Sequence, residues 1–428
     1  MSGTRPRVVI IGGGFGGLAC ARALDGRPAE VLLLDAHNYH LFTPLLYQVA
    51  TSLLNPSDIA YPHRAIFRRS PNVRFRQARV IDVDLAAKVV RTHAGEEIAF
   101  DTLVVATGSK NNYFANEELA RHTFGLKTMA EALRLRNHVL ACLELAARAV
   151  SDEERRPWLT FVIAGGGPTG VEYAGALAEL LDLVLGHDYP ELDRRLARIV
   201  VVEGVDRLLG AFHPTLGGYA ADTLRHRGIE VRTSTLVREA TDERVTLSDG
   251  EDIATRTVVW SAGVRPTDPL GERVPERARS SRVRVDPFLR LDGREDVFVI
   301  GDAASVEERG GELPMLSPPA MQEGRYVARR IVDGPTGRPF RYLDKGTMAT
   351  IGRRAAVAEV RGLRFRGTIG WLAWLLVHIY YLIGFRNRAA VLASWGWNYL
   401  RKDRPIRVIV RGLPDDVAAR LDSESEAP

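Results

Sequence analysis

The fold is decided by the stretch Gly12-Gly13-Gly14-Phe15-Gly16-Gly17, whose pattern returns later in the chain as Gly165-Gly166-Gly167-Pro168-Thr169-Gly170. Each stretch closes an apolar run typical of a buried strand and opens an apolar, helix-like segment. In a G-x-G-x-x-G turn the first glycine permits the tight turn, the second lets backbone approach a pyrophosphate, and the third lets the helix pack close to the strand. The free N–H groups at the helix start attract phosphate. Two such turns in one chain predict two dinucleotide-binding sites.

The first turn belongs to a strand–turn–helix–strand unit. We expect a strand over Arg7–Ile11, a helix around 18–24 and a second strand over 29–34. Asp35 follows at the separation where a carboxylate accepts hydrogen bonds from ribose hydroxyls. The alternative interpretation is a solvated aspartate at the end of a strand.

The second turn belongs to a unit of the same kind. It comprises a strand over 159–164, a helix over 171–185 and a strand over 198–202, after which Glu203 takes the place of Asp35. A carboxylate there binds the ribose 2′-hydroxyl of NADH and repels the 2′-phosphate of NADPH. NADH is therefore the expected nicotinamide, although Arg207 leaves a minor activity with NADPH open.

Two further strands end in small residues of the kind expected beside a cofactor. A strand that begins at 102 ends in Thr107 and Gly108, and a late strand from 297 ends in Gly301 and Asp302. The late strand predicts that the chain returns to the first unit, where Asp302 can hydrogen-bond the ribityl chain or bridging phosphate of a flavin. Taken alone, Asp302 could equally be a helix cap or a turn aspartate.

We therefore predict an α/β fold with two Rossmann-like dinucleotide-binding domains, one for FAD and one for NADH, and a C-terminal membrane-associating helical region. The expected FAD-binding domain is discontinuous, over 1–115 and 291–345, around an NADH-binding domain over 116–290. The remaining residues, 346–428, form the expected membrane-anchoring region. Its acidic end from 415 is predicted to be a mobile tail.

Composition limits the chemistry. The 428 residues are 46% apolar and 26% charged, as in ordinary globular proteins of two or three domains. Two cysteines, Cys20 and Cys142, are too few for a disulfide framework and lack C-x-x-C spacing. Because a dithiol relay needs such a pair beside the flavin, electrons are expected to leave this flavin directly. No metal-ligand cluster is predicted, and nucleic acid is not an expected partner.

The segment 369–385 has no formally charged residue and contains two tryptophans and two tyrosines. A helix that is apolar nearly all round must be buried in protein or in lipid. From 361 to 410 there are nine Lys and Arg against one Asp, a charge that suits an anionic membrane surface. We predict a monotopic anchor on the membrane lipid surface. A core helix, a dimer interface and a full crossing are the alternatives.

These residues together resemble the type II NADH:quinone oxidoreductases, single-subunit respiratory flavoenzymes that do not pump protons. The matching stretches are 42–50, 165–175, 261–266, 301–302 and 378–388. The resemblance implies non-covalent FAD, NADH as electron donor and a quinone as acceptor. It also implies a peripheral position on the cytoplasmic face of the cell membrane, and a homodimer.

The resemblance also carries over two catalytic candidates. Glu172 matches a family glutamate near the flavin and nicotinamide, and Gln322 matches a family glutamine near the quinone site. A glutamate stabilised by the dipole at a helix start is the alternative for Glu172. The full set of candidate cofactor-binding residues is Gly12, Gly14, Phe15, Gly17, Asp35, Thr107, Gly108, Gly165, Gly167, Gly170, Glu203, Gly263, Gly301 and Asp302.

Two other functions share the dinucleotide sites. A soluble NAD(P)H-dependent flavoprotein reductase would donate electrons to a protein such as ferredoxin or rubredoxin and would not need the apolar segment. A non-catalytic flavoprotein that senses NADH would hold FAD but show no turnover with any quinone.

Overall fold

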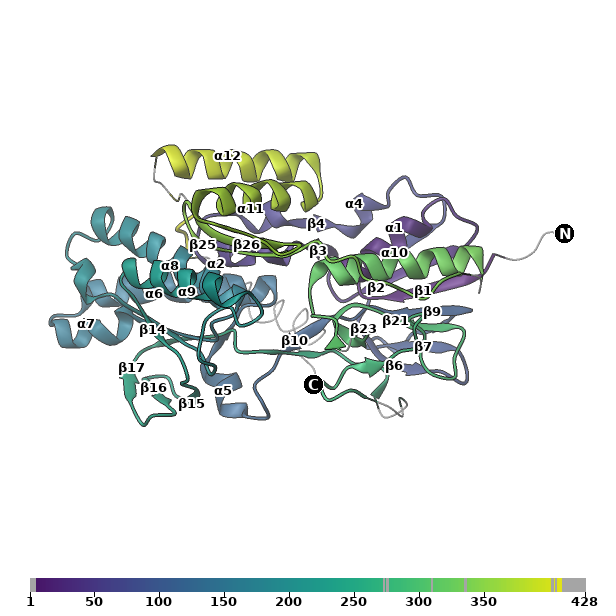
Figure 1. Ribbon diagram of the computed structural model, residues 1–428, viewed down its shortest axis with the longest axis horizontal. Coiled ribbons are helices and arrows are strands. Elements are labelled where there is room, and N and C mark those ends of the chain that lie inside the picture. The colour runs from purple at the N-terminus through teal and green to yellow at the C-terminus, as the bar shows by residue number, and fades with distance from the viewer. Residues whose placement is uncertain are drawn as a thin grey trace.

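The computed structural model describes residues 5–271, 274, 277–308, 311–334, 337–401, 404 and 406–409. Two units lie side by side, each built on a five-stranded parallel sheet, and the last two helices lie above one unit and the junction between the two (Figure 1). The predicted acidic tail from 415 lies outside the described residues.

The first sheet has the strand order β21-β9-β1-β2-β5. Its strands are β1 (Arg7–Ile11), β2 (Glu30–Asp35), β5 (Val73–Gln77), β9 (Thr102–Val105) and β21 (Val297–Val299). β21 pairs with β9, so the predicted return of the late strand to the first unit is confirmed. All four described contacts between neighbouring strands are parallel, and most side chains of β1, β2 and β9 are buried.

Two helices, α1 (Phe15–Leu24) and α10 (Ser317–Asp333), pack together beside this sheet (Figure 1). A Cβ atom on Gly324 would lie 2.2 Å from the carbonyl oxygen of Gly16, so these helices cross at a glycine contact. α1 begins three residues earlier than the sequence predicts. The reason is that Gly14 has extended backbone and acts as the N-cap, so the helix starts directly at the turn.

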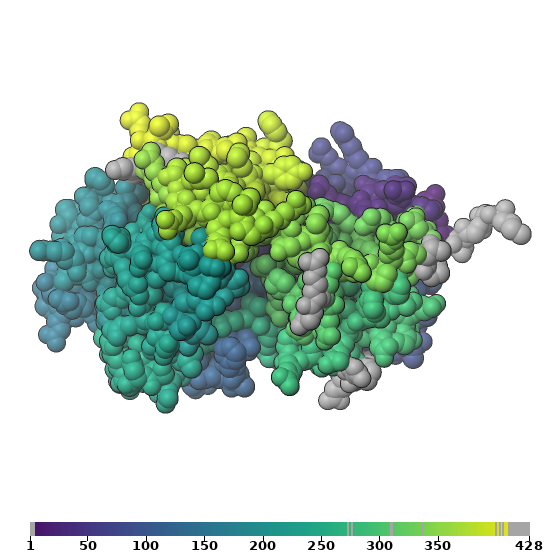
Figure 2. Space-filling view, in the orientation of Figure 1, coloured from purple at the N-terminus to yellow at the C-terminus, as the bar shows by residue number. Residues whose placement is uncertain are grey.

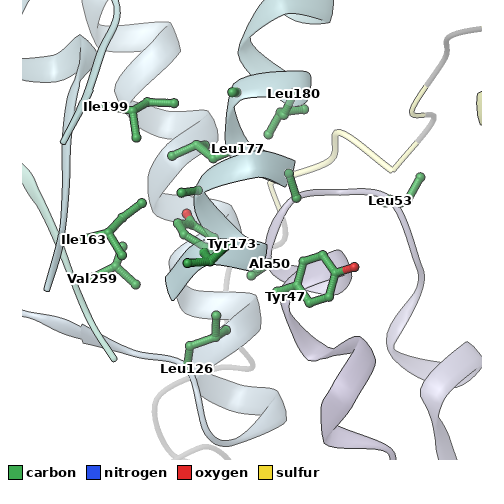
Figure 3. Close-up of a cluster of buried hydrophobic side chains, with 14 of the residues drawn as sticks. Tyr47, Ala50, Leu53, Leu126, Ile163, Tyr173, Leu177, Leu180, Ile199 and Val259 are labelled. Atoms are coloured by element: carbon green, nitrogen blue, oxygen red, sulfur yellow. The ribbon is translucent and has the colours of Figure 1, made fainter. Parts of the chain in front are cut away.

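The second sheet has the order β11-β18-β12-β13-β14. Its strands are β11 (Phe124–Gly125), β12 (Thr160–Ala164), β13 (Arg198–Val202), β14 (Ile229–Arg232) and β18 (Thr257–Trp260). α8 (Pro168–His187) is apolar on most of its circumference and is buried on more than one side. Figure 3 shows why: its Tyr173 and Leu177 lie between Ile163 of the sheet and Tyr47 of α2 (Leu46–Ala50).

Shorter elements complete the two units. β10 (Ser109–Asn111) and β19 (Val264–Pro266) form an antiparallel pair where the chain passes between the units. The other strands and α-helices of the two units are β3 (Tyr39–Leu41), α3 (Pro56–Ile59), β4 (Ala60–Pro62), α4 (His63–Ile66), β6 (Val80–Asp84), β7 (Val89–Thr92), β8 (Glu97–Ala99), α5 (Glu117–His122), α6 (Met129–Arg148), α7 (Asp152–Leu159), α9 (Pro214–His226), β15 (Val237–Ala240), β16 (Arg244–Leu247), β17 (Asp252–Ala254), β20 (Val283–Arg284), β22 (Ala304–Ser305), β23 (Glu307–Glu308) and β24 (Gly311–Glu312).

The C-terminal region is a three-stranded antiparallel sheet followed by two helices. The strands are β25 (Thr347–Gly352), β26 (Ala355–Val360) and β27 (Leu363–Arg366), and the helices α11 (Gly367–Tyr381) and α12 (Phe385–Arg401) form the C-terminal helix pair. The predicted apolar helix thus ends at Tyr381, and Gly384 has a positive φ of 89° in the turn between the helices. None of the described helices is long and apolar enough to span a bilayer.

Side chains far apart in the sequence fix the C-terminal helix pair to the body. Asn387 is buried and donates from Nδ2 to the carbonyls of Ser57 and Asp58, both at 3.0 Å. Arg404, which follows α12 and is 1% exposed, donates to the carbonyl of Thr51 at 2.8 Å and to that of Ala176 at 3.0 Å. The pair is therefore part of the folded unit.

Candidate functional site

At two positions of the first glycine turn, a side chain would collide with the backbone. Gly12 has a φ of +99°, and a Cβ there would lie 2.2 Å from the carbonyl oxygen of Ala106. A Cβ on Gly17 would lie 1.8 Å from the Gly12 oxygen, whereas one on Gly14 would meet nothing within 4 Å. The space beside Gly14 is open at the start of α1, where an approaching phosphate would find backbone N–H groups. Phe15 begins that helix.

The second turn repeats this geometry closely. Gly165 has a φ of +106°, and a Cβ on Gly170 would lie 1.9 Å from the Gly165 oxygen. A Cβ on Gly167 would again meet nothing. The first glycine of each turn donates to the end of the neighbouring strand: Gly12 to Leu34 at 2.7 Å and Gly165 to Val202 at 2.8 Å. The two turns are the same backbone structure built twice.

Each turn is bridged by the carboxylate at the end of its second strand. Asp35 Oδ2 accepts from the N–H of Gly13 at 2.6 Å, and Oδ1 accepts from the N–H of His37 at 2.7 Å. Burial alone would raise the pKa of Asp35, but the hydrogen bonds from His37 and Gly13 hold it below its ordinary value. Asp35 is thus an anion placed beside the turn.

Glu203 bridges the second turn in the same way. Its Oε2 accepts from the N–H of Gly166 at 2.6 Å, and its Oε1 accepts from the N–H of Val205 at 3.0 Å. Arg207, which the sequence left as a possible phosphate ligand, donates to the carbonyl of Gly210 at 3.2 Å. The carboxylate, and not this arginine, contacts the turn.

The residues packed behind the two turns differ in chemistry. His40 Nδ1 donates to the Gly13 oxygen at 3.0 Å, and the ring of His63 lies against Gly13. In the second unit the N–H of Leu209 donates to the Gly166 oxygen at 2.9 Å, and Leu208 lies against Gly166. His63 is fully buried, stacks on Phe75 at 4.8 Å, and has no well-aligned hydrogen-bond partner for either ring nitrogen among the described residues.

Further predicted residues lie at the junction of the two units, next to the strand pair β10 and β19. Thr107 Oγ1 donates to the carbonyl of Thr267 at 2.6 Å, and the N–H of Thr267 donates to Gly108 at 2.9 Å. Gly263 has its carbonyl bonded to Asn112 at 3.0 Å and lies against Phe114. Residues from both units therefore meet beside the end of β9.

Gly301 and Asp302 follow β21 at the same end of the first sheet. Asp302 accepts from the Ser109 hydroxyl and lies 3.6 Å from Lys127 Nζ. The N–H of Gly301 donates to Oε2 of Glu323 at 2.5 Å. Sequence reasoning missed Glu323, which is fully buried on α10 and whose Oε1 has no partner among the described residues. Burial raises the pKa of Glu323 to about 7.

Glu172 lies on α8, two residues after the last glycine of the second turn, where α8 packs against the C-terminal region. A Cβ on Gly175 would lie 2.2 Å from the Ile351 oxygen, so α8 approaches β25 closely. Glu172 is 9% exposed and accepts from the N–H of Thr350 at 3.2 Å. Burial raises the pKa of Glu172 to about 8, against weaker opposing effects of the Thr350 N–H and the Trp374 indole. Glu172 is therefore neutral over much of the physiological range.

Gln322 occupies a different place. Its amide donates to the carbonyl of Leu343 at 3.0 Å and accepts from the Leu343 N–H at 3.0 Å. These two bonds tie α10 to the following segment. Glu172 is not among the hydrogen-bond partners of Gln322, so the two catalytic candidates are not joined by a direct contact.

Aromatic side chains of the C-terminal helix pair cover the matching stretch 42–50. The Trp374 ring stacks on His378 at 4.0 Å and approaches Tyr47 at 6.4 Å. Trp395 Nε1 donates to Oε1 of Gln48 at 2.8 Å, and Gln48 Nε2 donates to Tyr47 at 2.8 Å. Sequence reasoning matched the stretch 42–50 to the family and singled out the apolar segment 369–385. It had no signal for these contacts, because the tryptophans lie more than 300 residues from Tyr47 and Gln48.

With this geometry in place, comparison with known proteins decides the family. A model described as pyridine nucleotide-disulphide oxidoreductase matches residues 6–324. Two type II NADH:quinone oxidoreductases of Mycobacterium tuberculosis, NdhA and Ndh, are 38% and 37% identical, each over 94% of this chain and 89% of its own length. The chain belongs to the type II NADH:quinone oxidoreductases.

A solved structure shows that the fold extends over nearly the whole chain. The NDH2 of Plasmodium falciparum in complex with NADH has a TM-score of 0.86 and 19% identity, and the match covers 95% of this chain and 100% of that one. The predicted α/β fold is confirmed, and the chain is an oxidoreductase of the NADH:quinone class.

Both cysteines of this type II NADH:quinone oxidoreductase are buried, Cys20 in α1 and Cys142 in α6. Burial raises the pKa of the Cys20 thiol to about 12 and that of Cys142 to about 11. Thiols held protonated in separate units are poor redox partners. No dithiol relay is built from them.

Proposed function

We propose that the chain transfers two electrons from NADH to a membrane quinone through bound FAD, without pumping protons. One observation carries the proposal: the same phosphate-binding backbone is built twice, on two sheets whose ends meet at the strand pair β10 and β19. Bound flavin accepts hydride from nicotinamide and passes electrons on. The protein supplies binding, orientation and exclusion of water.

FAD is assigned to the first unit, over 1–115 and 291–345. The open space at Gly14 and the N-terminus of α1 suit its pyrophosphate, and the Asp35 anion suits an adenosine ribose. Asp302, beside Ser109 and Lys127, is the proposed partner of the ribityl chain or phosphate.

NADH is assigned to the second unit, over 116–290. Gly167 leaves the corresponding space open at the start of α8, and Glu203 presents a carboxylate where the ribose 2′-hydroxyl would bind. The 2′-phosphate of NADPH would meet this negative charge. We therefore propose that NADH is preferred.

Glu172 is proposed to hold a proton near the site of quinone reduction, because quinol formation takes up two protons. Its carboxyl is buried below Trp374 of the C-terminal helix pair, and its pKa is about 8. A carboxyl in this range can both hold and release a proton near neutral pH. Gln322 as a quinone-site residue stays a prediction from the resemblance.

The C-terminal helix pair is proposed to rest on the membrane surface, with the protein peripheral on the cytoplasmic face. Large apolar side chains project from it: Leu376 is 72% exposed, Tyr380 71% and Phe385 88%. In Figure 2 the pair forms the upper edge of the molecule. An apolar face bordered by basic residues is typical of monotopic helices. A homodimer stays a prediction.

One cuvette experiment tests the proposed reaction. Purified protein should show a flavin absorbance spectrum that bleaches on anaerobic addition of NADH and recovers on addition of a short-chain quinone. Colourless folded protein would contradict the proposal. A flavin that NADH bleaches but only a ferredoxin reoxidises would favour the soluble reductase, and a flavin that no quinone reoxidises would favour a sensor.

The proposed membrane face has a separate test. Replacing Leu376, Tyr380 and Phe385 by Gln should lower binding to vesicles while turnover with a short-chain quinone is kept. The matched control replaces three exposed apolar residues of the second unit, Val150, Val205 and Leu236, by Gln. Equal loss of vesicle binding in both variants would contradict the assignment of the face.

A further inference from the structure

A basic groove runs along the outer side of α10, outside the dinucleotide sites. It has a volume of about 930 Å³ and is lined by α10 and by the segment 337–345. We define the basic groove by its six cationic residues, Arg325, Arg329, Arg330, Arg338, Arg341 and Lys345. Asp333 is the one carboxylate in its lining.

The charge of the basic groove is large for its size. Six cations and one carboxylate give a net +5 in the lining, which equals the formal net charge of all 428 residues. Arg325, Arg338 and Arg341 are exposed and form no ion pair with a carboxylate in the part of the chain that the structure describes. Arg330 differs, because it stacks over the Phe288 ring at 4.4 Å. Concentrated charge of one sign attracts polyanions.

The groove is built by contacts on the side away from solvent. Tyr326 donates its hydroxyl to the carbonyl of Arg338 at 2.9 Å, and its ring packs edge-on against Phe340 at 5.5 Å. The double hydrogen bond between Gln322 and Leu343 closes the other end. These contacts hold segment 337–345 along α10, so the backbone that carries the cations has a defined position.

The groove adjoins the C-terminal helix pair. Lys345 Nζ lies 3.1 Å from the hydroxyl of Tyr381, the last residue of α11, and its ammonium lies 5.8 Å from that ring. The neighbouring Tyr380 belongs to the exposed apolar face. Figure 2 shows the green surface that includes α10 below and to the right of the yellow-green surface of the pair. The positive charge therefore begins where the apolar face ends.

We propose that the basic groove binds the phosphate headgroups of anionic phospholipids when the helix pair rests on a membrane. The inference builds on the proposed membrane face. Arginine can donate two parallel N–H groups to phosphate oxygens. All six cations of the groove except Arg330 are exposed, and all of the exposed ones except Lys345 are arginines. Because the groove is open and its cations are exposed, it suits headgroups presented by a surface better than one enclosed small anion.

The test uses full-length protein and two triple variants of equal charge change. The groove variant replaces Arg325, Arg329 and Arg341 by Gln. The control variant replaces Arg195, Arg225 and Arg238, exposed arginines of the second unit, by Gln. Cosedimentation is measured with vesicles of phosphatidylcholine alone and of phosphatidylcholine mixed with phosphatidylglycerol, and turnover with NADH and a short-chain quinone is measured alongside.

The groove variant should lose about a hundredfold of its partition into the mixed vesicles, since each of the three basic residues near an anionic leaflet contributes roughly fivefold. Its partition into phosphatidylcholine and its turnover should stay unchanged, and the control should stay within about twofold of the original. Equal losses in both variants, or no loss in the groove variant, would overturn the proposal.

Two more outcomes are decisive. Calorimetric binding of inorganic phosphate that the groove variant loses while it keeps vesicle binding would assign the groove to free phosphate and overturn the lipid proposal. Groove-dependent binding to mixed vesicles by a protein without quinone turnover would support the groove and contradict the proposed function.

Discussion

The two glycine turns share one backbone but are backed by different chemistry. Behind the first lie His40 and His63, and behind the second lie Leu208 and Leu209. Burial lowers the pKa of His40 to about 4 and also lowers the pKa of His63. The two turns of this chain thus share the backbone shape that the close glycine contacts set, while the side chains packed behind them are polar in one and apolar in the other.

The largest expected effect comes from placing a methyl side chain in each glycine turn, one turn at a time. Gly17→Ala and Gly170→Ala each put a Cβ less than 2 Å from a backbone oxygen, which costs about 3 kcal/mol or more. We expect Gly17→Ala to yield colourless protein. We expect Gly170→Ala to keep its flavin and to need roughly a hundredfold more NADH for bleaching.

Spectra of the two purified variants and NADH titrations provide the measurement. Gly218→Ala, on α9 where a Cβ meets nothing, is the matched control and should behave as the original protein. Loss of flavin from Gly170→Ala with NADH binding retained would reverse the assignment of the two units.

Glu172 distinguishes the second unit, because Ala19 stands at the equivalent place after the first turn. The folded-state pKa of Glu172, about 8, lies above its unfolded value of about 4.5. The contribution of Glu172 to the stability of the folded protein is therefore fully present at a pH below 4.5, and it is lost as the pH rises towards 8. Glu172→Gln should therefore unfold with a free energy higher by about 4 kcal/mol at pH 8, but by less than about 1 kcal/mol at pH 5, since each pKa unit corresponds to roughly 1.4 kcal/mol.

Denaturant titrations of Glu172→Gln and the original protein at the two pH values measure this difference. Turnover separates the proton role from a structural one: flavin reduction by NADH should be kept while quinone turnover falls. If Glu172→Gln leaves both rates unchanged, the proposed proton role is wrong.

The bridging carboxylates give a smaller effect on selectivity. Glu203→Gln removes the charge that would repel the 2′-phosphate, so kcat/KM for NADPH relative to NADH should rise about tenfold, or roughly 1.4 kcal/mol. Asp35→Asn is the control, and should weaken retention of FAD without changing the nicotinamide ratio. A changed ratio in Asp35→Asn would mean that the carboxylates do not divide their roles by unit.

The smallest expected effect comes from replacing the histidine packed behind the first turn by leucine, the type of residue packed behind the second turn. His63→Leu removes a buried imidazole whose folded-state pKa lies below its unfolded value of about 6.5. The original protein therefore loses stability as pH falls below about 6.5, and the leucine variant lacks this loss. At pH 5 the variant should be more stable by about 1 kcal/mol.

Acid unfolding followed by tryptophan fluorescence measures the shift. His187→Leu, at the exposed end of α8, is the control and should leave the profile unchanged. An acid profile of His63→Leu identical to that of the original protein would show that the imidazole is not the source of the sensitivity.

The backbone of both sites follows from local sequence, because glycine spacing, apolar runs and strand-end carboxylates are separated by a few tens of residues. The return of Val297–Val299 to the first sheet also follows from its pattern. His63, Glu323 and Gln48 do not, because their positions depend on packing between distant segments. A lone polar residue in an apolar stretch gives no signal of what it will contact.

Asn387 and Arg404 fasten the C-terminal helix pair at its two ends to carbonyls near Ser57 and Thr51. These buried hydrogen bonds tie the pair to the body at both places. On the proposed membrane face, the tilt of the molecule and the depth of Tyr47 below the lipid would therefore be set by the folded body. Substituting Asn387 or Arg404 should therefore make the orientation on the membrane less defined, and should do so before it changes binding at either nucleotide site.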